Sequence, residues 1–119
     1  MVLRGEPYPE PELPFETTGA LLIKYKDRHP DKTAIHDLDQ EKKITWGELH
    51  DLANRMARFL SERGIEKGDR VALLSDETLE KLICWMGIWR AGAVVCPTNV
   101  EMNAAHMNRL LGHIEPKLI

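Results

Sequence analysis

The residue types in this chain that most often bind metals or act as nucleophiles are five histidines and two cysteines. His106 and His113 fall two turns apart on one predicted helix, whereas zinc sites favour histidines four residues apart with another ligand nearby. His50 lies between Glu48 and Asp51 on the polar side of another predicted helix, where we expect it to be solvated. These positions therefore predict surface or capping histidines, and we assign no metal ligand.

The two cysteines, Cys84 and Cys96, lie inside apolar stretches and form no CxxC pair. Both are expected to be small buried hydrophobic residues, which suits a reducing compartment. The N-terminus lacks the basic region and apolar core of a secretory signal. The most apolar stretch, residues 83–96, is interrupted by Arg90 and is too short to span a bilayer. We therefore expect a cytoplasmic protein.

Phosphate chemistry has one weak candidate, residues 87–92 (GIWRAG), whose glycine spacing matches the opening of a phosphate-binding loop. Ala93 and Val94 follow where Lys and Ser or Thr are needed, and the stretch ends a predicted helix instead of opening one. A formal net charge of −3 argues against a general nucleic-acid surface. We therefore predict neither a phosphate loop nor nucleic-acid binding.

Two further positions invite a ligand hypothesis. Trp85 and Trp89 lie one turn apart and could line a pocket, but their helix is apolar nearly all round, which favours core packing. Residues 97–99 (PTN) follow a predicted parallel strand, and ligands of open α/β sheets bind near such strand ends. For Asn99 a turn is favoured, since Asn and Pro are common in turns, and a hinge or ligand-supporting role is the alternative.

The elements that position these residues alternate along the chain. Residues 1–16 contain four of the seven prolines, which predicts an extended arm. The periodicity that follows predicts helices at about 17–28, 46–63, 77–90 and 103–113, a hairpin of 33–36 with 43–45, and strands at 70–74 and 93–96. Thr45 and Glu48 form a capping-box pattern, and Gly64 is placed to end the helix that follows. Ser75 or Asp76 is the predicted cap of the helix at 77–90.

The strand–helix–strand pattern over residues 70–96 predicts a right-handed crossover between two parallel strands. The strand at 70–74 should be buried on both faces, and Gly87 should permit a close helix approach. The predicted fold class is therefore α/β, a partial parallel sheet with flanking helices plus a small antiparallel hairpin. We expect an arm at 1–16 and a single domain portion at 17–119.

Several motifs of this chain occur in a characteristic order. They are residues 29–35 (HPDKTAI), 44–49 (ITWGEL), 64–72 (GIEKGDRVA), 88–99 (IWRAGAVVCPTN) and the tail from 103 to 119. In type and spacing this series resembles the adenylate-forming superfamily of acyl- and aryl-CoA synthetases, nonribosomal peptide adenylation domains and beetle luciferases. The matched motifs are turns, caps and packing residues, and none is a reacting group.

The resemblance implies the N-terminal part of an ATP-dependent acid–thiol ligase, with a parent enzyme active in fatty-acid metabolism. Such an enzyme converts a carboxylate into an acyl-adenylate with Mg-ATP and then transfers it to coenzyme A. The family's Gly/Ser/Thr-rich loop ending in Pro-Lys, its ribose-binding aspartate and its catalytic lysine have no counterpart in these 119 residues. We therefore assign no catalytic, cofactor-binding or metal-binding residue, and expect no turnover by this chain alone.

Two other readings stay open at this point. Residues 116–119 (PKLI), which end in two apolar side chains, look like a strand just starting, which is expected of a fragment or of an end covered by a partner. A non-catalytic α/β interaction or regulatory module docking on a partner chain is the first alternative, and an unrelated small nucleotide-binding α/β protein is the second. The carboxylic acid, the choice between coenzyme A and a carrier-protein thiol, and homo-oligomer formation are left undecided.

Overall fold

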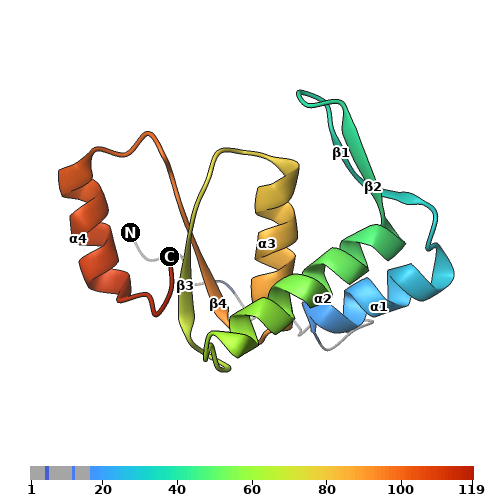
Figure 1. Cartoon of the computed structure of the whole chain (residues 1–119), viewed down its shortest axis with the longest axis horizontal. Helices are drawn as coiled ribbons and strands as arrows, with labels where there is room; N and C mark the ends of the chain where they lie inside the picture. The colour runs from blue at the N-terminus through green and yellow to red at the C-terminus, as the bar shows by residue number, and fades with distance from the viewer. Residues whose placement is uncertain (1–4, 6–11, 13–16) are drawn as a thin grey trace.

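The structure is a computed structural model that describes residues 5, 12 and 17–119, and the arm predicted at 1–16 lies outside the described residues. Helices and strands alternate in it, which confirms the mixed α/β class (Figure 1). In chain order the elements are α1 (Thr18–Arg28), β1 (Thr33–Asp37), β2 (Lys42–Thr45), α2 (Trp46–Glu62), β3 (Arg70–Leu74), α3 (Leu79–Arg90), β4 (Val94–Thr98) and α4 (Ala104–Ile114).

Two small sheets organise these elements. β3 and β4 pair in parallel along their whole length, and β1 and β2 pair antiparallel, as the sequence predicts. Beyond β3, Leu118 forms a parallel bridge with Val71, and its carbonyl accepts the N–H of Ala72 at 2.9 Å. The tail therefore lies beside β3 and makes one parallel bridge to it. Figure 1 shows α3 and α4 on opposite sides of the β3–β4 pair.

Helix α2 begins and ends as its sequence predicts. The Thr45 hydroxyl accepts the N–H of Glu48 at 3.2 Å, and the Glu48 carboxylate accepts the N–H of Thr45 at 2.8 Å, so the capping box is complete. At the other end Gly64 adopts a left-handed φ of 77°, which favours glycine. Both ends of the helix are therefore fixed by local sequence.

Helix α3 packs closely across α2 at Gly87. A Cβ atom at this position would lie 2.4 Å from the Cβ of Met56 and 3.2 Å from the carbonyl oxygen of Ala53. Gly87 thus permits the close helix approach that its place in an apolar helix predicts.

The core forms two clusters, and α2 contributes to both. At one end of α2 the buried side chains pack against α1, the hairpin and α3, and at the other end they pack against the β3–β4 pair. The first contains Leu22, Ile44, Leu49, Ala53 and Leu79, and the second contains Leu60, Ile65, Val71, Ile88 and Ala93. Within the described ranges, no helix combines the length and the apolar character needed to cross a membrane.

The start of α3 differs from the prediction. The helix begins at Leu79 instead of Glu77, and its cap is Thr78, whose hydroxyl accepts the N–H of Lys81 at 3.2 Å. A carboxylate oxygen of Asp37, at the end of β1, also accepts the N–H of Leu79 at 3.2 Å. Ser75 or Asp76 was therefore the wrong choice, because the nearer Thr78 is the cap; only the second contact, from a distant strand, is invisible to the local sequence.

The expected burial of α3 and β3 is also wrong in part. Leu82 and Trp89 of α3 are 37% and 40% exposed, and Leu74 at the end of β3 is 48% exposed. The described elements cover these side chains only in part. The prediction that β3 is buried on both faces therefore fails at Leu74, and the largely buried α3 that its apolar character predicts is partly exposed at Leu82 and Trp89.

Candidate functional site

The turns of two sequence motifs, at residues 64–72 and 88–99, meet at the amino ends of β3 and β4. The N–H of Gly68 donates to the carbonyl of Gly92 at 2.9 Å, and the N–H of Val94 donates to the carbonyl of Asp69 at 2.8 Å. Gly92 has a φ of 78°, and a Cβ there would lie 3.3 Å from the Lys67 side chain. The two motifs that contain these glycines therefore fasten the start of one strand to the start of the other.

The carboxylate of Asp69 ties this turn to the end of the chain. It accepts the N–H of Glu66 at 2.7 Å and the ammonium of Lys117 at 2.6 Å. The Lys117 contact, followed by the Glu66 N–H, holds the pKa of Asp69 below its usual range, and the same contact raises the pKa of Lys117. Both contacts are made by the same oxygen, Oδ2, so Asp69 is a structural carboxylate that joins this turn to the tail.

A second pair of motifs meets next to α1. The carbonyl of Pro30 accepts the N–H of Gly47 at 2.9 Å, and the carbonyl of Lys32 accepts the N–H of Trp46 at 3.0 Å. The Trp46 ring stacks on Tyr25 with centroids 4.8 Å apart. The motifs at 29–35 and 44–49 therefore hold the hairpin and α2 against α1, and their residues act on the fold.

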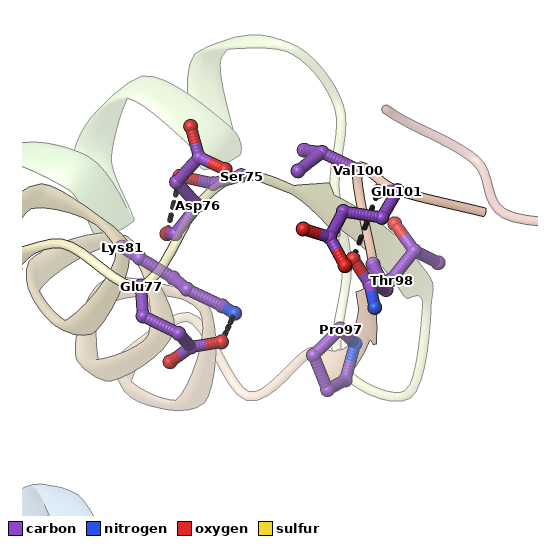
Figure 2. Close-up of a pocket in the computed structure, with 9 residues that line it drawn as sticks. Ser75, Asp76, Glu77, Lys81, Pro97, Thr98, Val100 and Glu101 are labelled. Atoms are coloured by element: carbon purple, nitrogen blue, oxygen red, sulfur yellow. Dashed lines mark hydrogen bonds and ion pairs between the residues drawn. The ribbon is translucent and has the colours of Figure 1, made fainter.

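The candidate site lies at the opposite, carboxyl ends of the same two strands. There an open groove of about 420 Å³ is lined by residues 75–77 and Lys81 after β3, and by residues 97–101, the end of β4 and the loop that follows it. Figure 2 shows Lys81 and Glu77 on one side of the groove and Glu101 on the other. Carboxyl ends of parallel strands are where open α/β sheets bind ligands, so the stretch 97–99 does lie where the sequence places it.

Lys81 is the charged residue that the sequence reasoning missed. Only 6% of it is exposed, and its ammonium donates to the carboxylate of Glu77, which is 88% exposed. An ammonium taken out of water needs a counter-ion, and Glu77 supplies it one helical turn away. The four-residue spacing of the two was visible in the sequence, but nothing local indicates that one of them is buried.

The loop after β4 is a turn. A side-chain oxygen of Asn99 accepts the N–H of Glu101 at 2.8 Å, and its carbonyl accepts the N–H of Met102 at 3.2 Å. The hydroxyl of the buried Thr98 donates to the carbonyl of Leu73 at 3.3 Å, joining the ends of the two strands. The turn predicted for Asn99 is confirmed, and the hinge role stays a prediction.

The groove does not fit a nucleotide phosphate. Three carboxylates line it, those of Asp76, Glu77 and Glu101, and its buried ammonium is already paired. The amino end of α3 offers little either, because the first N–H donates to Asp37 and the third to the Thr78 hydroxyl. Backbone donors, that of Gln40 first, hold the pKa of Asp37 below its usual range, so it stays an anionic cap. No step with ATP is assigned to these residues.

The histidines and cysteines take no part in the groove. His106 and His113 are exposed on α4, as predicted, and the described residues hold no cluster of His, Cys, Asp and Glu suited to a metal ion. Cys84 and Cys96 are half-buried, so full burial was wrong for both. Desolvation raises the pKa of the Cys84 thiol, which makes it a poor nucleophile at neutral pH.

The prediction that His50 is solvated is wrong, because its side chain is part-buried. Its Nδ1 atom is fully buried and has no hydrogen-bond partner in the described structure, and its Nε2 atom lies 3.0 Å from the side-chain nitrogen of Asn54. Burial first, and then the positive charges of Arg90 and Lys26, hold the pKa of His50 below its usual value. The ring is therefore a neutral packing residue between α2 and its neighbours.

Trp85 and Trp89 pack edge to face, with ring centroids 5.7 Å apart and an interplanar angle of 75°. Trp85 is half-buried, whereas Trp89 lines a shallow surface hollow beside Gly19 and Arg90. Core packing was the expectation for both, and it is wrong for Trp89.

Comparison with known proteins gives a family match along most of the chain. The model of the family described as "AMP-binding enzyme" matches residues 23–119. A nonribosomal peptide synthetase, tcpP of Claviceps purpurea (strain 20.1), is 33% identical over 100 residues, which is 83% of this chain and 5% of that protein. The long-chain-fatty-acid–CoA ligase of Bacillus subtilis (strain 168) is 37% identical over 87 residues, which is 73% of this chain and 15% of the ligase.

A solved structure shares the fold as well. The inhibitor-bound N-terminal domain of FACL13 from Mycobacterium tuberculosis superposes with a TM-score of 0.81 at 30% identity, covering 87% of this chain and 26% of that domain. The chain therefore spans only a small part of each of these relatives.

Proposed function

This chain belongs to the family of AMP-binding, adenylate-forming enzymes, and from that premise we propose that it is the N-terminal framework of the large domain of an acid–thiol ligase. The enzyme would activate a carboxylic acid with ATP as an acyl-adenylate and pass the acyl group to a thiol. The groove residues do not fit phosphate, so this proposal assigns the reacting groups to the rest of the enzyme. The role of this chain is to hold α2, α3 and the first parallel strands in place.

The observation that carries this proposal is the continuous family match over residues 23–119, combined with a shared fold. Both pairs of motif turns support a framework role, because they make backbone hydrogen bonds to one another at the amino ends of the strands and beside α1. Residues at that end of a parallel sheet stabilise the fold, whereas ligands bind at the other end.

We propose further that the thiol is coenzyme A and the acid a fatty acid. The similarity to the B. subtilis long-chain-fatty-acid–CoA ligase supports this choice. The similarity to the C. purpurea synthetase supports the alternative, an adenylating unit of a nonribosomal peptide synthetase. The family match sets aside an unrelated nucleotide-binding protein.

A segment replacement tests the framework role. In the B. subtilis ligase, the 87-residue matched stretch is replaced by the matching stretch of this chain, and fatty-acid-dependent ATP–pyrophosphate exchange is measured. We expect exchange well above that of the same ligase with the stretch deleted. A matched control carries Gly87→Val in the inserted stretch, which should abolish exchange by separating α2 from α3. A chimera that folds, with a cooperative melt, but shows no exchange would contradict the proposal.

A further inference from the structure

The start of α1 lies beside the end of α3 (Figure 1), and between them is a hollow of about 410 Å³, which we call the α1–α3 hollow. Residues 17–19 line it from the side of α1, and Trp89, Arg90 and Gly92 line it from the side of α3. Trp89 is 40% exposed, and the Nη1 atom of Arg90 makes a long contact of 3.5 Å to the carbonyl oxygen of Gly19. The hollow therefore combines a large, partly exposed aromatic ring with a cation.

Arg90 is short of acceptors in the part of the chain that the structure describes. It is half-buried, and none of the ion pairs between described side chains includes it. A guanidinium that has lost part of its hydration is stabilised by a carboxylate, which can accept two of its N–H groups at once. An occupant that suits this hollow therefore carries an acidic group beside an apolar one.

The segment that leads into α1 has this combination. Residues 13–16 (LPFE) are three apolar residues followed by a glutamate, and Glu16 directly precedes Thr17 on the rim of the hollow. A chain advances at most about 3.6 Å per residue, so the four residues must lie within roughly 14 Å of that rim. Because the segment is tethered there, its effective concentration is on the order of millimolar, and weak contacts suffice to hold it.

We propose that residues 13–16 occupy the α1–α3 hollow, with Pro14 and Phe15 against the Trp89 ring and Glu16 paired with Arg90. Proline-containing segments bind aromatic-lined grooves, because proline loses little conformational entropy on binding. The contact joins the chain that precedes α1 to the end of α3. This inference goes beyond the proposed function and does not depend on it, since it concerns only residues of this chain.

Nuclear Overhauser contacts in the full 119-residue chain test the placement. The chain has two phenylalanines, Phe15 and Phe59, so the ring signals of the two are readily told apart. We expect cross-peaks from the Phe15 ring to the Trp89 indole and none to the Trp46 indole, which stacks on α1 elsewhere. If neither Phe15 nor Pro14 gives a cross-peak to Trp89, the inference is overturned.

An exchange of charges tests the ion pair. Arg90→Glu and Glu16→Arg should each lower the ratio of docked to free segment about threefold, as loss of a partly exposed ion pair predicts. This ratio is read from the chemical shifts of the Phe15 ring. The double variant should restore it, which a purely structural role of Arg90 would not allow. Single variants without effect, or a double variant without recovery, would contradict the pairing.

Cleavage by chymotrypsin after Phe15 tests the aromatic contact. Trp89→Ser should speed this cleavage about tenfold, because the protease acts on the population of undocked segment. Leu82→Ser is the matched control, since Leu82 is a similarly exposed apolar residue of the same helix, at 37%, but does not line the hollow. Its cleavage rate should equal that of the unsubstituted chain. Equal rates for the two variants would count against the inference.

Two controls keep these results decisive. Only variants that melt like the unsubstituted chain are compared, and the cross-peaks of the unsubstituted chain stand whether or not a variant folds. A second copy of the chain is the other possible source of the segment, and a mixture of isotope-labelled and unlabelled chains detects it. Cross-peaks between Phe15 and Trp89 of different copies would replace intramolecular docking by a dimer and overturn the inference.

Discussion

At Gly87 two helix backbones come as close as the absence of a side chain allows. The atoms that a Cβ would meet are the Met56 Cβ and the Ala53 carbonyl oxygen, at 2.4 and 3.2 Å. Neither is the free end of a flexible side chain, so the helices themselves would have to move. This residue accordingly sets the distance between α2 and α3, on which both core clusters depend.

Gly87→Ala should therefore destabilise the chain although alanine is the better helix former. Overpacking typically costs about 1–3 kcal/mol, more than the roughly 1 kcal/mol that alanine contributes by propensity. Urea unfolding of the two proteins measures the difference. Gly112→Ala in α4 is the control, because a Cβ there meets nothing within 4 Å, and it should stabilise by about 0.5–1 kcal/mol. A stabilising Gly87→Ala would mean that the helices are not in contact there.

His50 makes the stability depend on pH. Its pKa in the folded chain lies below 6.5, so the unfolded state binds the proton more tightly. The neutral ring is fully compatible with the fold above pH 6.5, and stability should fall as the pH drops from there toward the folded pKa. The charged groups that act on the ring are Arg90 on α3, Lys26 and Asp27 on α1, and Asp51 on α2.

Urea unfolding at pH 7.5 and pH 5.5 tests this for His50→Gln. The variant should lose less stability between the two pH values than the unsubstituted chain, because its side chain cannot take up a proton. His106→Gln, on the exposed side of α4, controls for a general effect of removing a histidine and should leave the pH dependence as it was. Identical pH dependence in all three proteins would contradict the placement of His50.

At the scale of elements, the ends of α2 and α3 are fixed in different ways. α2 is capped by Thr45 and Glu48, three residues apart, so its start could be read from the sequence. α3 begins where Thr78 and the distant Asp37 both accept its first N–H groups, and the 42-residue separation of Asp37 from Leu79 hides this cap from any local pattern. The hairpin thus positions the helix as well as flanking it.

Thr78→Ala tests the corrected start of α3. Loss of an N-cap hydroxyl should destabilise the chain by about 1 kcal/mol, measured by urea unfolding. Ser75→Ala removes the residue that local sequence favours as the cap. Its hydroxyl donates only to the adjacent Asp76 carbonyl, so this substitution should change stability by less than about 0.5 kcal/mol. A larger loss of stability for Ser75→Ala than for Thr78→Ala would contradict this and place the cap at Ser75.

Periodicity and turn residues predicted most of this architecture, including the parallel β3–β4 pair. The groove was predicted only on its β4 side, at residues 97–99, because strand ends can be located from sequence. Its β3 side, with the buried Lys81, could not be predicted, since burial of a charge depends on packing between separate elements. The exposure of Trp89 could not be predicted either, because it too depends on packing between separate elements.

At the scale of the whole molecule, the strand pair is fastened at its amino ends and lined by carboxylates at its carboxyl ends. The turns of the motifs at 64–72 and 88–99 make the hydrogen bonds at the fastened end, and the carboxylates of the groove at the other end disfavour phosphate. This arrangement is the basis of our proposal that the chain is a frame for an adenylate-forming enzyme whose nucleotide is held by other parts of the protein.

The melting temperature of the 119-residue chain with and without Mg-ATP tests this division most directly. A nucleotide site filled at about a hundred times its Kd adds about 2.7 kcal/mol of stability, which for a domain of this size is a rise on the order of 10 °C. Our account predicts an unchanged melting temperature at millimolar Mg-ATP. A rise of that order would place a nucleotide site within these residues and contradict it.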